Sequence, residues 1–315
     1  MSIPSATKNT LEMTYEEWKS ERRKGIGGSD AAAVLGMSRW KSPMRVYLEK
    51  IGEIDNDVAG EAAYWGNVLE DVVAKEFSKR TGKKVQRVNR ILINSDYPFM
   101  IANIDRRVVG EDAILECKTT SAWNSKEWFD GEIPQEYIIQ VMHYMAVTGV
   151  SKAYIAVLLG GNQFQWKEVP RDDELIDLMI QREMDFWKCV DSGNPPEDKS
   201  GAPDDYAKVL AMIYPESTGD EIELPPTFEE LVEKLQGVKE QIKTLESTQT
   251  EFENAIKENM RESEQARVGR FRIGWKGVST RRFDTKAFEK DQPAMYDQYV
   301  KESAYRRFTI KEAKV

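Results

Sequence analysis

Two carboxylates and a lysine lie close together in one stretch, IANIDRRVVGEDAILECKTT, and could form a catalytic centre. A turn at residues 110–112 would reverse the chain between two strands and place Asp105 opposite residues 116–118. Glu116 and Lys118 are two residues apart, so their side chains point to the same face of a strand. The sequence therefore predicts two carboxylates and an ammonium converging at one end of a hairpin.

Buried like charges are unfavourable unless a counter-charge binds between them. Asp105 and Glu116 could hold a hard divalent cation whose coordination is completed by water and phosphate oxygens. Such a cation would polarise a phosphate and help to generate hydroxide, while Lys118 orients the nucleophile or stabilises developing charge. The alternative is a simple salt bridge between Lys118 and one of the carboxylates on a half-exposed sheet.

Two more polar side chains occur where predicted helices have an apolar face. Glu70 borders that face in a helix predicted over 61–79, and it is either a third metal ligand or a solvent-facing glutamate. Gln140 lies among apolar residues in a helix predicted from Pro134 to about Thr148. A buried amide needs a partner, so Gln140 either lines the site or is a hydrogen-bonded core residue.

The elements that would position these residues alternate between helix and strand. This order predicts an α/β (α+β) domain over 1–192, with a mixed central sheet flanked by helices. Residues 193–226 are rich in turn formers and predict a linker, whereas 227–262 repeats apolar residues at coiled-coil spacing. Residues 263–315 predict a basic hairpin followed by a short helix. The predicted strands of the first domain are 84–93, 100–109, 113–118, 151–159 and 164–169.

The charge of the chain is unevenly distributed. The formal net charge is −9, but residues 266–315 contain 13 Lys or Arg and six acidic residues, so this stretch is +7 and the remainder is −16. The acidic part is either an ordinary soluble surface or includes carboxylates that hold a cation. The basic hairpin at 267–282 could bind a phosphate backbone or be a solvated basic face.

Composition narrows the class of protein. With 40% apolar residues the chain can build a core, and it has no apolar run long enough for a membrane span. Cys117 and Cys189 are the only cysteines, which argues against a disulfide framework or a cysteine-ligated cluster. We therefore expect a soluble intracellular protein.

A glycine turn, GIGGSDAAAVLG, precedes a short helix near the N-terminus. Its exposed N–H groups could bind an anion, or Ser29 and Asp30 could simply cap the helix. Downstream, Trp40, Lys41 and Arg45 combine aromatic and basic character, as a DNA-end contact would; a core tryptophan with a solvated rim is the alternative.

Five segments, taken in order, resemble the YqaJ-type viral recombinase nucleases, a lambda-exonuclease-like family of the PD-(D/E)xK superfamily. They are GIGGSDAAAVLGMSRWKSPMRVYLEK, WGNVLED, NIDRRV, LECKTT and YIIQVMHYMAVTG. The similarity covers about residues 14–190, and the stretch 280–311 resembles the tail of long phage members less specifically. Ile104 stands where the superfamily usually has proline.

The resemblance implies a PD-(D/E)xK nuclease core and assigns roles to individual residues. Glu70, Asp105 and Glu116 would be the acidic metal residues, the Cys117 backbone carbonyl a further ligand, Lys118 the catalytic lysine and Gln140 the glutamine lining the site. Arg23 would bind a 5′-phosphate, with Ser29 and Asn103 as looser candidates. Many members read QxQH where this chain has Gln140-Val141-Met142-His143, so the second glutamine is missing. For His143, the only histidine, we expect a structural role.

The implied activity is a Mg²⁺- or Mn²⁺-dependent deoxyribonuclease that uses two ions. It would be a 5′→3′ exonuclease on double-stranded DNA ends, encoded by a phage or prophage and acting in the bacterial cytoplasm. It would work with a single-strand annealing protein, as a homo-oligomer such as a trimer. The alternatives are an endonuclease or nickase with the same core, or a DNA-binding assembly protein in which the carboxylates are only structural.

Overall fold

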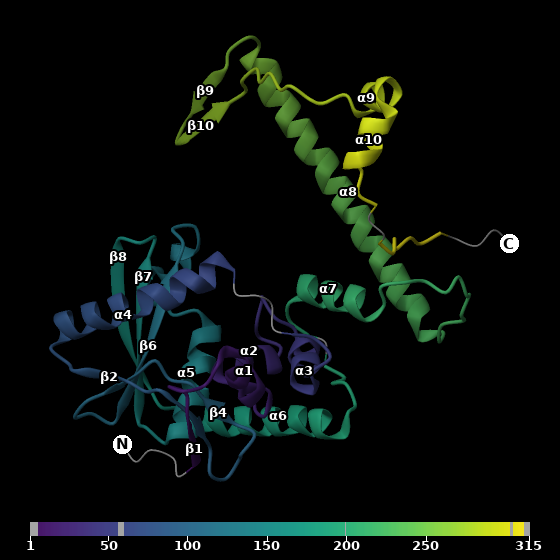
Figure 1. Cartoon of the computed structure of the whole chain (residues 1–315). Coiled ribbons are helices and arrows are strands. Elements are labelled where there is room, and N and C mark those ends of the chain that lie inside the picture. Colours follow the sequence, from purple (N-terminus) through teal and green to yellow (C-terminus); the bar gives the residue numbers. More distant parts are fainter. Residues whose placement is uncertain (1–5, 56–59, 199, 303–304, 312–315) are drawn as a thin grey trace. The chain divides into compact units, whose positions relative to one another are not determined.

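The computed structural model describes residues 6–55, 60–198, 200–302 and 305–311 (Figure 1). The chain forms two compact units, Met1–Ile213 and Tyr214–Val315. Among the described residues, no helix combines the length and the apolar character needed to cross a membrane.

A mixed five-stranded sheet forms the centre of the first unit, in the order β2-β5-β6-β7-β8. β6 runs parallel to β7, and the other neighbouring strands are antiparallel. The strands are β2 Val85–Arg87, β5 Arg106–Val108, β6 Ala113–Thr120, β7 Lys152–Leu159 and β8 Gln163–Pro170. The predicted register is confirmed, since Arg106 pairs with Leu115 and the next step places Asp105 level with Glu116.

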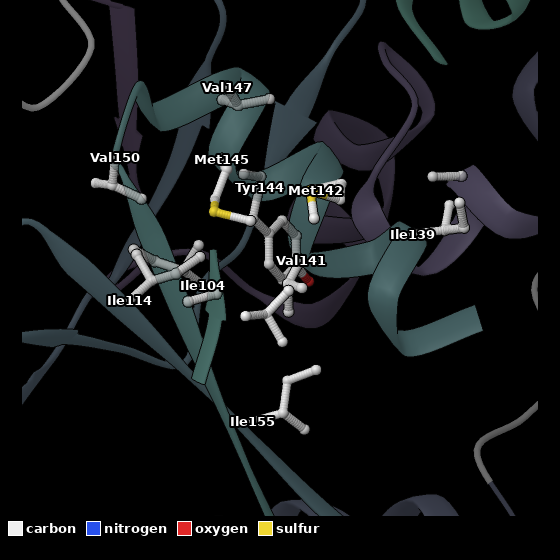
Figure 2. Close-up of a cluster of buried hydrophobic side chains, with 14 of the residues drawn as sticks. Ile104, Ile114, Ile139, Val141, Met142, Tyr144, Met145, Val147, Val150 and Ile155 are labelled. Atoms are coloured by element: carbon white, nitrogen blue, oxygen red, sulfur yellow. The ribbon is translucent and has the colours of Figure 1, made fainter. Parts of the chain in front are cut away.

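Helices cover both faces of this sheet. On one face, α4 (Glu61–Thr81) packs Val73 and Phe77 against Leu115. On the other face, α5 (Gln135–Thr148) shares a core with Ile114 and Ile155 (Figure 2). Because strand side chains alternate, Glu116 and Lys118 lie on the Ile114 side of β6 and point toward α5.

Further helices surround the sheet. They are α1 Tyr15–Arg23, α2 Gly28–Val34, α3 Pro43–Ile51, α6 Asp173–Ser192, α7 Pro203–Ile213 and a 3₁₀ helix, Asn124–Gly131. The predicted capping of α1 is confirmed, because Thr14 and Glu17 cap its N-terminus reciprocally. The predicted caps of α2 were wrong: Gly27 is the N-cap, and Asp30 lies within the helix, where its carboxylate accepts from the Gly27 N–H at 3.5 Å.

Two predicted strands are each divided between two sheets. The stretch 84–93 splits into β2 and β3 (Arg90–Ile93), and 100–109 splits into β4 (Ile101–Ala102) and β5. β3 and β4 form a separate three-stranded sheet with β1 (Ala6–Asn9), a strand that the sequence reading did not predict. The chain must leave one sheet to enter the other, so residues 103–105 carry no strand pairing and can present their side chains to a site.

Residues 193–226, predicted as a linker, contain the helix α7. Its Val209 is buried in the core, and its Asp205 binds Arg45 of α3. Turn-forming residues on either side of this helix led to the prediction of a linker, so its apolar face was not recognised in the sequence. The segment without helix or strand is therefore shorter and begins at Tyr214.

The second unit consists of a long helix followed by small elements. α8 (Thr227–Met260) is 34 residues long. It leads into the antiparallel hairpin β9 (Gln265–Val268) and β10 (Phe271–Gly274), followed by α9 (Thr285–Asp291) and α10 (Pro293–Tyr299). α8 thus covers most of the stretch with coiled-coil spacing, and the hairpin lies within the basic stretch.

Candidate active site

Gln140 joins the predicted acidic and basic residues in one buried network. Its Nε2 donates to Glu116 Oε1 at 2.7 Å, and its Oε1 accepts from Lys118 Nζ at 2.8 Å. Lys118 Nζ also donates to Glu116 Oε1 at 2.7 Å. An ammonium has no acceptor and a carboxylate no donor, so the amide can satisfy both partners in only one orientation.

Asp105 joins this network through the backbone of β6. The Cys117 N–H donates to Asp105 Oδ2 at 2.8 Å. Burial, followed by the charges of Glu116 and Glu70, raises the pKa of the Asp105 carboxyl well above its usual range. The Cys117 N–H and the Lys118 ammonium oppose this shift without cancelling it. Two carboxylates in this arrangement favour a bound proton or cation between them.

Two tyrosines complete the site, and the sequence reading missed both. Tyr144 accepts from Gln140 Nε2 at 2.9 Å, and burial followed by the charges of Glu116 and Asp105 raises its pKa well above the usual value. The Lys118 ammonium lies 4.8 Å from the centre of the Tyr137 ring. Helical spacing could have identified them, since residues three before and four after Gln140 share its face.

Lys118 keeps its charge although its side chain is largely withdrawn from solvent. Burial alone would lower the pKa of this ammonium, but the charge and hydrogen bond of Glu116, together with Asp105, raise it overall. The side chain therefore remains a cation and a hydrogen-bond donor across the physiological range.

Glu70 is held by arginines. It pairs with Arg106 and, at 3.1 Å, with Arg87; Arg106 also binds Asp71. Arg106 belongs to the NIDRRV segment, but the sequence reading gave it no role. Across the described residues, no three His, Cys, Asp or Glu side chains form a group arranged to hold a metal ion.

The donor set around β6 nevertheless fits a hard cation. Glu116 is almost fully buried, and its Oε2 accepts no hydrogen bond from any described residue. An unpaired carboxylate oxygen beside an Asp105 carboxyl with a raised pKa is a donor set that a hard, oxygen-seeking cation would satisfy. Asn103, Asp105 and Glu70 also line one hollow of about 320 Å³.

The glycine turn lies directly against this centre. A Cβ on Gly28 would meet the Tyr144 ring at 2.4 Å, so only glycine allows the turn to approach so closely. Arg22, at the end of α1, donates to Ser29 Oγ at 2.8 Å. The neighbouring Arg23 instead pairs with Asp55. Of the two arginines, Arg22 is therefore the one at the glycine turn.

A cluster of ion pairs between α2, α3 and Lys41 stabilises the glycine turn. Asp30 binds Lys50 at 2.7 Å and Lys41 at 2.9 Å, and Lys41 also binds Glu49. Burial alone would raise the pKa of Asp30, but the charges of Lys41, Lys50 and Arg22 hold it well below its usual range. Lys41 thus has a structural role here. So does Arg45, which is buried on α3 with its Nε 2.6 Å from Asp205. That position does not suit the DNA contact predicted for Arg45.

His143 has the structural role expected of it. It is completely buried, its Nδ1 lies 2.8 Å from Glu183 Oε1, and its Nε2 lies 2.9 Å from the Ile101 carbonyl oxygen. These contacts join α5, α6 and β4, and they leave neither ring nitrogen free for a metal.

Comparison with known proteins identifies relatives along almost the whole chain. A family model of the YqaJ-like viral recombinase domain matches residues 17–151. YqaJ of Bacillus subtilis (strain 168) is 47% identical over 307 residues, which cover 96% of this chain and 95% of YqaJ. Protein D345L of African swine fever virus (strain Badajoz 1971 Vero-adapted) is 32% identical over 65 residues, or 21% of this chain and 19% of that protein.

The fold also has a counterpart among solved structures. The alkaline exonuclease LHK-Exo of Laribacter hongkongensis superposes with a TM-score of 0.51 and 23% identity, covering 56% of this chain and 93% of that structure. The mixed α/β core predicted from the sequence is thus confirmed, and it shares its fold with LHK-Exo. Because YqaJ matches nearly end to end at 47% identity, the chain belongs to the family of YqaJ-like viral recombinases.

Proposed function

We propose that this protein is a metal-dependent deoxyribonuclease that degrades linear double-stranded DNA from its 5′ ends during phage-type recombination. The observation that carries the proposal is the orphaned Glu116 oxygen, which lies in a buried network with Lys118 and Gln140 and beside Asp105. A buried acid–lysine–amide cluster of this kind suits phosphodiester hydrolysis better than a purely structural role.

Asp105 and Glu116 would hold Mg²⁺ or Mn²⁺, with the Cys117 carbonyl and Glu70 as further ligands of a site for two ions. The bound cation would supply Lewis-acid polarisation of the phosphate and acidify a water molecule. Glu70 would have to exchange its arginine partners for a cation.

The side chains of the chain itself contribute positioning and charge. Lys118 remains an ammonium, so it can orient the attacking water and stabilise negative charge on the phosphate. Gln140 is a positioning residue, because its side-chain amide forms hydrogen bonds with both Lys118 and Glu116 and so fixes their separation. In hydrolysis, the water oxygen bonds to phosphorus, the phosphorus–O3′ bond breaks, and the leaving oxygen takes up a proton.

The 5′ end of the DNA would bind at the glycine turn. Arg22 and Ser29 offer a guanidinium and a hydroxyl beside Tyr144 of the centre. We therefore assign the 5′-phosphate contact to Arg22 rather than to Arg23. The protein would act as a homo-oligomer together with a single-strand annealing protein, and its similarity to viral recombinases supports this proposal.

The test uses 5′-phosphorylated linear duplex and closed circular duplex, each with Mg²⁺ and with EDTA. We expect Mg²⁺-dependent degradation of the linear DNA alone. Glu116→Gln and Lys118→Met should each lower the rate by at least about a hundred-fold while DNA binding persists. Lys152→Met and Glu168→Gln are matched controls, since these residues form an exposed ion pair in the same sheet. Cleavage of closed circles would indicate an endonuclease, and undiminished cleavage by Glu116→Gln would refute the proposed centre.

A further inference from the structure

The hairpin of the second unit has two chemically different faces. Its strands pair in register, with Arg272 opposite Arg267 and Ile273 opposite Ala266. Alternation therefore places Arg267 and Arg272 on one face and Val268, Phe271 and Ile273 on the other. The Trp275 N–H donates to the Glu264 carbonyl oxygen at 2.9 Å, which extends the pairing and puts Lys276 on the arginine face.

The basic face carries charges that have no acidic partner among the residues that the structure describes. Two arginines directly opposite one another repel, which destabilises a hairpin unless an anion binds between them. Among the described contacts, neither Arg267, Arg272 nor Lys276 forms an ion pair, whereas Lys257 of α8 is paired with Glu253. The face is thus charged and available for an outside anion.

A hollow of about 630 Å³ lies at this face. Arg267, Arg272 and Lys276 line it together with Gln265 and Gly274, and Ala266 and Ile273 also border it. Gly274 lies between Arg272 and Lys276 and has no side chain, and a Cβ placed there would meet only the Glu264 oxygen, at 4.0 Å. A glycine inside a strand allows another backbone to approach closely.

We propose that this basic face, in the second unit of the chain, is a second DNA-binding site, which binds the phosphodiester backbone. Guanidinium groups match phosphate oxygens bidentately, and three cations on one face can contact neighbouring phosphates of a nucleic-acid backbone. DNA is favoured over an acidic protein because the family processes DNA. The ligand class therefore rests on the proposed function, although the site is separate from the proposed centre.

The experiment measures binding of fluorescent duplex and single-stranded DNA to the full chain by anisotropy, in EDTA so that neither is degraded. We expect the Arg267→Gln/Arg272→Gln/Lys276→Gln variant to lose about ten-fold or more in affinity at moderate salt. Its log-affinity against log-salt slope should decrease by about 2–3 for duplex DNA. The control Lys188→Gln/Lys208→Gln/Lys243→Gln removes the same charge from exposed lysines elsewhere and should leave the slope unchanged.

Two further variants guard against misfolding and against a pure charge effect. Arg267→Lys/Arg272→Lys retains the charge and should restore most of the affinity. Gly274→Val fills the hollow without changing the charge, in a residue type that strands favour, and should weaken binding.

Three outcomes would overturn the proposal of a second site. The triple glutamine variant and its lysine control could bind DNA with equal affinity, or both could lose the same affinity for DNA. Gly274→Val could also bind DNA as tightly as the wild type. If only one of the two DNA forms binds more weakly to the variant, that form is the one that the site binds. If neither does, the site does not bind DNA, and an acidic protein is the alternative ligand. Failure of the nuclease proposal would be seen in a different assay, because Glu116→Gln would then cleave DNA as fast as the wild type.

Discussion

Buried charge at the centre is stabilised by a chain of specific partners. Glu116 receives hydrogen bonds from Lys118 and Gln140 on one oxygen, and its other oxygen receives none from the described part of the chain. The Asp105 carboxyl accepts a hydrogen bond from one backbone N–H. Removing a single partner would leave a buried charge without compensation, which is far more costly than losing a surface ion pair. We therefore expect these side chains to act as one unit and their substitutions to be strongly non-additive.

The arginine at the glycine turn can be tested by its effect on end recognition. Arg22→Gln should reduce the preference for 5′-phosphorylated over 5′-hydroxyl linear duplex by about ten-fold, as expected for loss of a charge-assisted hydrogen bond. Arg23→Gln is the matched control, because it removes the same charge one residue along the helix, where the partner is Asp55. Competition between the two DNA ends in one cleavage reaction measures the preference. A loss that follows Arg23 instead would return the contact to that residue.

The single histidine predicts a pH dependence of stability. Burial would lower the pKa of His143, but the charge and hydrogen bond of Glu183 and the Ile101 carbonyl outweigh it and raise the pKa above its usual value. A raised folded-state pKa stabilises the fold below the unfolded pKa and loses this contribution as pH rises through the folded pKa. The free energy of unfolding should therefore decrease as pH rises above the ordinary histidine pKa of about 6.5.

Denaturant titrations of the wild type and of His143→Gln test this dependence. The variant should be less stable at the acidic end, and the two curves should converge as pH rises. Because the chain has one histidine, a single imidazole NMR signal reports its titration directly. Parallel stability curves, or a midpoint at or below the ordinary histidine value, would contradict the assignment.

At the scale of elements, the sequence predicted what short-range patterns determine. The Gly110 turn and the two-residue alternation correctly placed Asp105 level with Glu116, and helical spacing placed Gln140 on a buried face. The division of 84–93 and 100–109 between two sheets depends on tertiary pairing that no local pattern encodes. Which of Arg22 and Arg23 lies at the glycine turn also depends on tertiary packing, since adjacent helical residues point about 100° apart and only the packing of α1 decides which one faces the turn.

The long helix α8 predicts self-association. Phe228, Leu231, Leu235, Val238, Ile242, Leu245, Phe252 and Ile256 follow a heptad spacing with Gln249 as the one polar interruption, and all but Leu235 are exposed. A stripe with a 3.5-residue period suits a second helix better than a broad globular surface. Ile242→Lys should therefore lower the molar mass measured by sedimentation equilibrium. Ser247→Lys, on the opposite side of the heptad, should not, and a wild type that already sediments as a monomer would refute the prediction.

For the whole molecule, the placement of charge matters more than its sum. The net −9 combines acidic residues over the first 265 positions with a basic excess in the last 50. At the proposed centre, carboxylates would bind DNA only through a cation, whereas the hairpin meets phosphate with its own arginines. Binding of DNA in EDTA should therefore depend on the second unit, and cleavage on the first.

The division into two units predicts a preferred site of proteolysis. Residues 214–226 contain no helix or strand, and every residue there is exposed. This segment has no lysine or arginine but contains Glu216, Glu221 and Glu223, so a glutamate-specific protease should cut there before it cuts the hydrogen-bonded helices. Mass spectrometry of a brief digest should show an N-terminal fragment ending at one of these three residues. Because this fragment keeps the sheet, α7 and the buried Arg45–Asp205 pair, it should unfold cooperatively on heating. First cuts within α4–α7 would contradict the boundary at residue 213.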